Sequence, residues 1–160
     1  MLRVFKPLPV AHEVHRSGAL PPAAREYARD SLTLDWEERM KARALRRSDG
    51  GVEFGTSLPR GTILRSGDLL VLDAVATCVE VREREEPVLV IEPATPEERA
   101  RFAYHIGNSH QPMMVADLAI VCPDVPGMAE VLDSHRIPFT RARRPFTPIG
   151  HVPDHRHQQQ

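Results

Sequence analysis

The sequence predicts an α+β protein with an all-β N-terminal domain, a C-terminal βαββαβ domain and a histidine-containing tail. Two observations carry this prediction. In the first half, apolar and polar residues alternate between residues 32 and 44, and glycine and proline then separate short apolar runs. After residue 94, helix-start signals alternate with strand-like segments. The 160 residues suffice for one or two small domains.

Composition excludes several classes of protein. Charged residues make up 27% of the chain and the formal net charge is -1, so a strongly basic nucleic-acid-binding face is not expected. No run approaches the roughly 18 apolar residues that a membrane helix needs. The first residues lack the long apolar core of a signal peptide, and two cysteines, Cys78 and Cys122, are too few for a disulfide framework. We therefore expect a cytoplasmic protein with no membrane or nucleic-acid partner.

The predicted N-terminal domain spans residues 1–74. From Leu32 to Ala44 the even positions are apolar with the single exception of Glu38. This alternation predicts one long half-buried strand. Its outer face would carry basic residues, either as a solvated face or as a docking site for an acidic partner. Those basic residues are Arg39, Lys41 and Arg43, and the further strands are predicted at Val52–Phe54, Thr62–Arg65 and Leu69–Leu72.

The predicted C-terminal domain spans residues 75–147 and contains a well-marked helix. Thr95 is a suitable N-cap, Pro96 suits the first helical position, and two glutamates follow. The helix is expected to end near Ile106, with Gly107 as the residue that leaves it. The remaining predicted elements are strands at Cys78–Arg82 and Val88–Glu92, a hairpin of Gln111–Val115 and Leu118–Val121, a helix at Pro123–His135 and a strand at Arg136–Phe139.

The order β-α-β-β-α-β is typical of a ferredoxin-like sandwich. Residues 148–160 are rich in proline, histidine and glutamine, and we predict that they form a flexible tail.

The main candidate site is the segment Gly107-Asn108-Ser109-His110-Gln111-Pro112. A lone imidazole just past a helix end has no acid or base beside it, so we do not expect it to be catalytic. It can hold a metal ion if other ligands are supplied, and His151, His155 and His157 in the last ten residues are candidates. The plainer alternatives are an ordinary loop histidine and a solvated tail.

Three other residues are candidate auxiliary metal ligands. His105 lies one turn from the predicted helix end, where it either caps carbonyls, packs against the sheet or binds metal. Cys122 precedes the second helix and, with Asp124, offers a thiolate and a carboxylate. Cys78 alternates with valines and is expected to be a small buried residue.

The sequence contains no motif of a known enzyme chemistry. A Gly-x-Ser-x-Gly elbow, a phosphate loop, a dinucleotide fingerprint and a HExxH motif are all absent. We therefore expect no enzymatic activity.

Three blocks of the sequence carry a family resemblance: residues 34–44 (LDWEERMKARA), 53–67 (EFGTSLPRGTILRSG) and 104–112 (YHIGNSHQP). Together they resemble the urease accessory protein UreE family of nickel metallochaperones. The resemblance covers residues 1–147. It implies an N-terminal domain like the peptide-binding domain of J-domain chaperones, a ferredoxin-like metal domain and a homodimer, with a metal-linked tetramer as an open alternative. The implied partners are the accessory GTPase UreG and the urease apoprotein complex.

The resemblance also assigns a role to His110. It matches the family's metal-binding histidine, which meets its twofold mate at the dimer interface, although Ser109 replaces the usual arginine. Many relatives carry a His-x-His or Asp-His pair just before the second helix. Here that region reads Cys122-Pro123-Asp124, so the auxiliary site is either missing or rebuilt from a thiolate and a carboxylate.

These observations lead to two hypotheses. The first is a nickel-binding metallochaperone that delivers Ni(II) to apo-urease, with one His110 from each chain anchoring the ion and tail histidines completing its shell; Zn(II) and Cu(II) are alternatives at the same sites. The second is a peptide-binding adaptor of the urease assembly complex with incidental metal binding. A zinc-dependent hydrolase would need an acidic base near the metal, and none is close to His110 in sequence.

Overall fold

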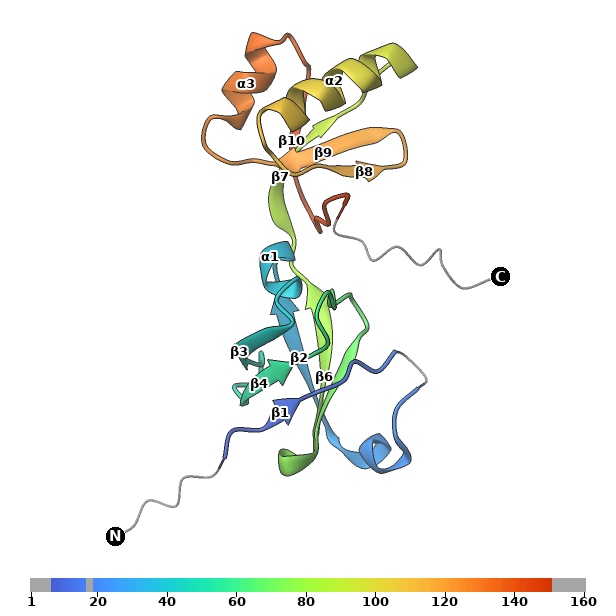
Figure 1. The fold of residues 1–160 in the computed structure, drawn as a ribbon, viewed down its shortest axis with the longest axis vertical. Coiled ribbons are helices and arrows are strands. Elements are labelled where there is room, and N and C mark those ends of the chain that lie inside the picture. The colour runs from blue at the N-terminus through green and yellow to red at the C-terminus, as the bar shows by residue number, and fades with distance from the viewer. Residues whose placement is uncertain (1–6, 17–18, 151–160) are drawn as a thin grey trace. The chain divides into compact units, whose positions relative to one another are not determined.

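The structure is a computed structural model that describes residues 7–16 and 19–150. It divides into two compact units, residues 1–83 and 84–160, which are described separately (Figure 1). Among the described residues, none of the helices combines the length and apolar character needed to cross a membrane.

The N-terminal unit is built from two three-stranded sheets. One has the order β1-β4-β3 and the other β2-β6-β5. The strands are β1 (Val10–Ala11), β2 (Ala28–Leu34), β3 (Arg43–Arg47), β4 (Glu53–Ser57), β5 (Leu69–Leu72) and β6 (Thr77–Glu83); the helices are α1 (Trp36–Arg39) and the short 3-10 turns η1 (Pro22–Glu26) and η2 (Asp73–Val75). The parallel pairing of β2 with β6 is the longest, running from Ala28 opposite Thr77 to Leu34 opposite Glu83.

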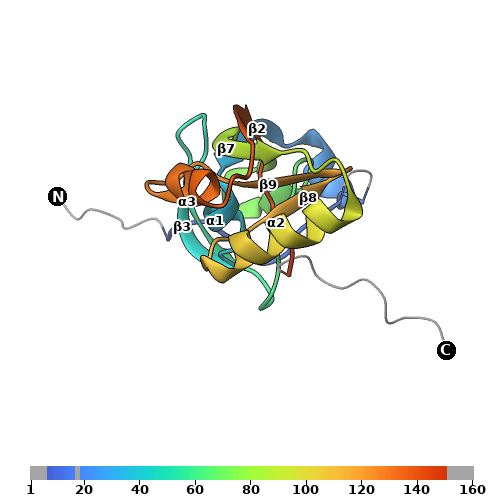
Figure 2. The same cartoon turned by 90° about the horizontal axis from the view of Figure 1, so that it is seen from above.

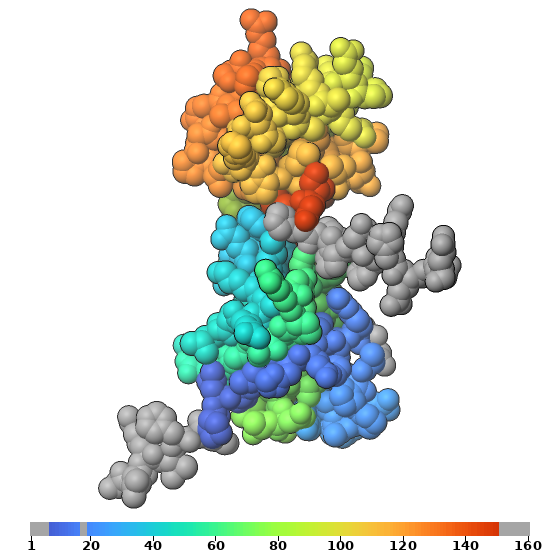
Figure 3. Space-filling view, viewed as in Figure 1, coloured from blue at the N-terminus to red at the C-terminus, as the bar shows by residue number. Residues whose placement is uncertain are grey.

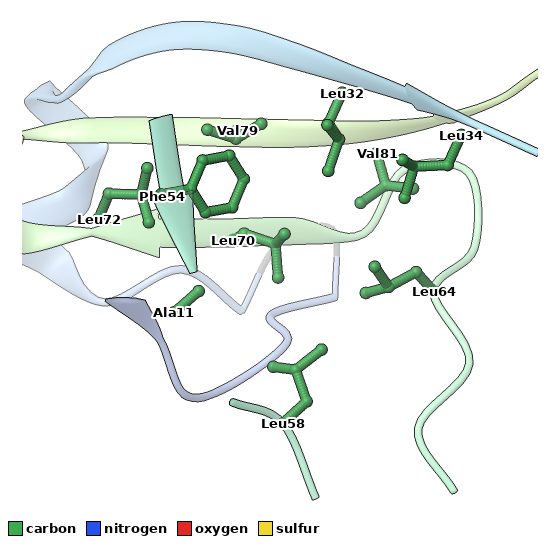
Figure 4. Close-up of a cluster of buried hydrophobic side chains, with 10 residues drawn as sticks. All are labelled: Ala11, Leu32, Leu34, Phe54, Leu58, Leu64, Leu70, Leu72, Val79 and Val81. Carbon is green, nitrogen blue, oxygen red and sulfur yellow. The ribbon is translucent and has the colours of Figure 1, made fainter. Parts of the chain in front are cut away.

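The core of this unit lies between the two sheets. Phe54 of β4 projects its ring toward Leu70, Leu72 and Val79 of the other sheet, as Figure 4 shows. The ends of β2 and β5 bury alternate residues, as a period-2 pattern predicts, whereas β4 and β6 each bury three residues in succession. The buried cluster consists of Ala11, Leu32, Leu34, Phe54, Leu58, Leu64, Leu70, Leu72, Val79 and Val81. Cys78 is also fully buried, as predicted.

The long strand predicted for Leu32–Ala44 is wrong, because a helical turn interrupts it. The Asp35 carboxylate accepts a hydrogen bond from the Glu38 N–H at 2.8 Å, and the Glu38 carboxylate accepts one from the Asp35 N–H at 3.1 Å. This capping box starts α1 and ends β2. Arg39, predicted on an outer face, is only 1% exposed and donates to the Leu64 carbonyl oxygen at 3.3 Å.

Other boundaries of the N-terminal unit also differ from the prediction. The strand expected at Val52–Phe54 is β4, and the one at Leu69–Leu72 is confirmed as β5. No strand forms at Thr62–Arg65. The domain boundary lies at residues 83 and 84 instead of 74 and 75, because β6 pairs with β2 and β5. Alternation identifies a strand but does not say which sheet it joins.

The C-terminal unit is a βαββαβ sandwich, as predicted. Its antiparallel sheet has the order β10-β7-β9-β8. Both helices cover one face of this sheet (Figure 2). The elements are β7 (Glu86–Ile91), α2 (Pro96–Asn108), β8 (Met114–Ala116), β9 (Ala119–Pro123), α3 (Met128–Ser134) and β10 (Thr140–Arg144). Their core contains Leu89, Ile91, Phe102, Ile106, Ile120, Cys122, Met128, Leu132 and Ile137.

Several boundaries in this unit differ from the prediction. The hairpin strands predicted at Gln111–Val115 and Leu118–Val121 are β8 (Met114–Ala116) and β9 (Ala119–Pro123). The first helix continues through Gly107 to Asn108. The second begins at Met128 rather than Pro123, because two prolines precede it and Gly127 takes the N-cap position with φ 87°. The last strand begins at Thr140 rather than at Arg136. Arg136 has a left-handed backbone, with φ 55°, and the chain leaves the helix there instead of starting a strand.

Replacing the N-cap of α2 should lower the stability of the C-terminal unit. The Thr95 hydroxyl accepts a hydrogen bond from the Glu98 N–H at 3.1 Å. Thr95→Ala removes this acceptor and should cost about 1 kcal/mol. Thr95→Ser keeps the hydroxyl and serves as the control. Urea unfolding followed by circular dichroism measures both, and equal losses in the two variants would contradict a capping role.

Candidate metal centre

His110 stands where the chain leaves α2. The Ser109 N–H donates to the carbonyl oxygens of His105 and Ile106, both at 3.2 Å, and the Ser109 hydroxyl donates to Ile106 at 2.6 Å. The His110 N–H then donates to the Gly107 carbonyl oxygen at 3.0 Å. These bonds satisfy carbonyl groups that the end of the helix would otherwise leave unpaired. They hold His110 directly at the helix end.

The backbone of His110 is left-handed, with φ 57°. We expected glycine, at position 107, to take this helix-ending role, but Gly107 lies inside α2. Histidine is among the residues that tolerate this region better than most, yet it still pays a cost that glycine would not. The side chain that this strained position carries is an imidazole, a group able to ligate a metal ion. The residue is exposed to solvent.

The end of the described chain returns to the neighbourhood of His110. The Ile149 N–H donates to the Met113 carbonyl oxygen at 2.8 Å, and Met113 is three residues beyond His110. An extended chain spans at most about 3.6 Å per residue. His151 is therefore within about 7 Å of chain from Ile149, and His155 and His157 have a longer reach. These three histidines lie outside the described residues.

Other ligands of a metal at His110 are not assembled in the described part of one chain. Within residues 7–16 and 19–150, no three histidine, cysteine, aspartate or glutamate side chains come together in a way that could hold a metal ion. A metal bound by His110 would therefore need ligands from the tail or from a second chain.

Cys122 does not fit its predicted role as an auxiliary ligand. It lies on β9, opposite Leu89, and is fully buried in the core. Burial raises the pKa of its thiol to about 12, and the negative charge of Asp124 adds to the shift. The side chain is thus a neutral thiol, whereas a metal needs the thiolate. The sequence alone does not show that Cys122 is buried, because the register of β9 decides that Ile120 and Cys122 face the core.

Asp124 and His105 are also engaged elsewhere. The Asp124 carboxylate accepts a hydrogen bond from the Arg141 Nε–H at 3.0 Å across to β10. The His105 ring stacks on that of His135 at the end of α3, with centroids 3.8 Å apart and planes 20° from parallel. Burial, followed by the positive charges of His135 and Arg101, lowers the pKa of His105. His135 was not among the predicted residues, since its sequence signal is only that of a helix end.

Comparison with known proteins identifies the family. Residues 10–82 match the model of the UreE urease accessory protein N-terminal domain, and residues 86–160 match that of its C-terminal domain. The chain belongs to the UreE urease accessory protein family. The two matched regions meet at residues 82–86, which agrees with the division of the structure into two units. The family carries the name of an accessory protein rather than of an enzyme.

Individual members of the UreE family are also similar to the chain. The urease accessory protein UreE of Verminephrobacter eiseniae is 35% identical over 148 residues, which cover 89% of this chain and 86% of that protein. The urease accessory proteins UreE of Burkholderia orbicola and Burkholderia thailandensis are 36% and 37% identical over 118 residues, or 74% of this chain. The chain spans 57% and 55% of the length of those two relatives.

Glycine at position 110 should preserve the fold. His110→Gly relieves the left-handed backbone, while the more flexible unfolded chain opposes part of that gain. We expect the free energy of unfolding to be unchanged or raised by up to about 1 kcal/mol, as measured by urea unfolding. A marked loss of stability would show that the imidazole holds the fold together, which would contradict our interpretation of this residue.

The Cys122 thiol should make stability depend on pH in alkali. Its folded pKa of about 12 exceeds the ordinary thiol pKa of 9.0, so the unfolded chain loses the proton first. The stabilisation is complete below pH 9 and is lost between about pH 9 and 12, by up to about 1.4 kcal/mol per pH unit. Urea unfolding of wild type and Cys122→Ala across this range should show a shallower decline in the variant. Parallel pH profiles would overturn the assignment.

Proposed function

We propose that this protein is a nickel metallochaperone that carries Ni(II) to apo-urease during assembly of the urease metallocentre. Membership of the UreE family supports a role in urease maturation. The observation that carries the nickel part is the exposed His110, held in a left-handed backbone beside the returning end of the chain. Imidazole nitrogen is a good ligand for Ni(II), which lies high in the divalent affinity order. Zn(II) and Cu(II) are alternative cargoes for the same imidazoles.

In this proposal, the site is shared between two chains. One His110 from each chain anchors the ion, and His151, His155 or His157 completes the coordination shell. The C-terminal unit carries exposed apolar side chains that a second chain can cover, and such exposure marks interaction surfaces. They are Tyr104 (66% exposed), Val115 (49%), Leu118 (69%) and Ile149 (47%). A homodimer through this unit is therefore part of the proposal, with metal-linked tetramers as a further possibility.

A shared site suits a protein that must both bind a metal ion and release it. Ordering the tail around the ion costs conformational entropy, so ligands from the tail bind less tightly than fixed ligands. Tail histidines can also exchange one at a time with those of an acceptor. The proposed acceptors are the accessory GTPase UreG and the urease apoprotein complex in the cytoplasm. The GTPase would supply nucleotide hydrolysis, for which this sequence has no phosphate loop.

Nickel binding should depend strongly on His110 and partly on the tail. Isothermal titration with Ni(II) should show an affinity at least about tenfold lower for His110→Gly, which the backbone tolerates. Joint replacement of His151, His155 and His157 by alanine should lower the affinity or the stoichiometry without abolishing binding. The mass of the complex, measured by light scattering, should be that of a dimer.

The matched control is His12→Ala, which removes an exposed histidine of the N-terminal unit. It should bind nickel like wild type. If His110→Gly also binds like wild type, the proposed nickel site is wrong. A monomer that binds nickel with full affinity would contradict the shared site. The second hypothesis, an adaptor with incidental metal binding, predicts that binding of urease proteins is unaffected by His110→Gly and by chelator.

A further inference from the structure

The last turn of α2, which leads the chain to His110, is weak by its own sequence. It contains Gly107 and Asn108, and glycine is the poorest helix former after proline. The ends of helices also fray. If this turn opened, His110 would sample many positions, and fixing it again on a metal ion would cost conformational entropy. A fixed position for His110 therefore depends on contacts from outside α2.

The short helix α3 supplies such contacts from both of its ends. At its first residue, the Met128 sulfur lies 4.0 Å from the Ser109 hydroxyl oxygen. At its C-cap, the His135 ring stacks on that of His105, with the centroids 3.8 Å apart. His105 and Ser109 are about one turn apart, so the two contacts hold this turn at both of its ends. Together they form the α3 clamp, and Figure 3 shows the orange residues of α3 adjoining the gold end of α2.

The helix α3 is itself firmly held in the C-terminal unit. Met128 and Leu132 are buried, and both belong to the core that also contains Ile106 of α2. The Ile137 N–H donates to the Leu132 carbonyl oxygen at 2.9 Å, which closes the end of α3. The His135 ring therefore projects from a rigid element, although the residue is exposed to solvent.

Backbone hydrogen bonds carry the effect of the clamp to His110. The Ser109 N–H donates to the carbonyl oxygen of His105, the residue whose ring is stacked, and the Ser109 hydroxyl donates to the Ile106 carbonyl oxygen. The His110 N–H donates to the Gly107 carbonyl oxygen at 3.0 Å. While the clamp holds His105 and Ser109, these bonds stay closed. The backbone of His110 then keeps one conformation.

We propose that α3 fixes the position of His110 through this clamp, with His135 as the positioning residue. The inference rests on the proposed function, because it concerns how the divalent cation at His110 is held. His135 acts through the face of its ring and not as a ligand. Among the residues that the structure describes, it belongs to no group of three side chains able to hold a metal ion. Residues that orient a metal-binding histidine strengthen metal binding.

His135→Ala tests the clamp by removing the stacked ring from an exposed position. In EDTA, amide hydrogen exchange at Ser109 and His110 should become about three- to tenfold faster, the factor expected for loss of an aromatic pair. His135→Phe keeps a ring that can stack but that cannot bind a metal ion, and it should restore slow exchange. His12→Ala, the same change at an exposed histidine of the N-terminal unit, should exchange like wild type.

Position 107 offers a rescue by a different route. Gly107 does not have a left-handed backbone, and a Cβ added there meets nothing within 4 Å, so alanine fits. Gly107→Ala strengthens the last turn through helix propensity alone. In the double variant Gly107→Ala/His135→Ala, exchange at Ser109 and His110 should return toward the wild-type rate. A lost ligand or a lost charge could not be replaced in this way.

Isothermal titration with Ni(II) connects the clamp to the metal site. His135→Ala should lower the affinity about two- to fivefold, because the apparent affinity falls with the fraction of chains in which the site is competent. The stoichiometry and the visible absorption spectrum of the bound Ni(II) should not change, since the ligands are the same. His135→Phe and the double variant should bind nearly as tightly as wild type. Urea unfolding confirms that each variant is folded.

The proposal is overturned if His135→Ala leaves the exchange of Ser109 and His110 or the nickel affinity unchanged. It is also overturned if His135→Phe behaves like His135→Ala, or if Gly107→Ala restores nothing. A changed Ni(II) spectrum in His135→Ala would make His135 a ligand instead of a positioning residue. The exchange measurement contains no metal, so it decides the clamp even if the nickel proposal fails. Loss of nickel binding in His110→Gly, with unchanged exchange in His135→Ala, would leave the nickel site standing without the clamp.

Discussion

The way the chain leaves α2 governs the chemistry of the C-terminal unit. The last carbonyl groups of the helix are satisfied by the N–H groups of Ser109 and His110, and the chain then leaves the helix through a left-handed residue at position 110. That single backbone conformation places an imidazole in solvent at the end of a rigid helix. Core residues of α2 such as Phe102 and Ile106 anchor the helix, so this histidine is attached to a rigid support.

The rest of the unit is arranged around that fixed imidazole without adding fixed ligands to it. Cys122 is a neutral thiol in the core, Asp124 is paired with Arg141, and His105 is stacked on His135. Each of these groups satisfies a structural demand of the sandwich. What lies near His110 in sequence and structure is the last described segment of the chain, tied to Met113 through Ile149. In the proposed metal site, this division would hold one ligand in place and leave the others able to exchange.

The sequence predicted the βαββαβ order, the start of α2 at Thr95 and the position of His110 just past the end of that helix, because these depend on neighbouring residues. Capping needs only a hydroxyl and the N–H three residues later, and a lone histidine after a helix is visible in the sequence itself. The same local logic failed at Asp35 and Glu38. There the alternation of apolar residues predicted a continuous strand, although the capping-box residues that start α1 were also present in the sequence.

The sequence by itself predicted the chain order of the C-terminal elements and the residues whose side chains are able to ligate a metal. Tertiary structure decided which of those residues are accessible, because burial depends on strand register and on partners far away in the chain. Cys122 entered the core through the pairing of β9 with β7, and β6 joined the N-terminal unit through β2. Val10 and Leu45 likewise share a face only once β1, β4 and β3 lie side by side, since no local pattern links residues so far apart.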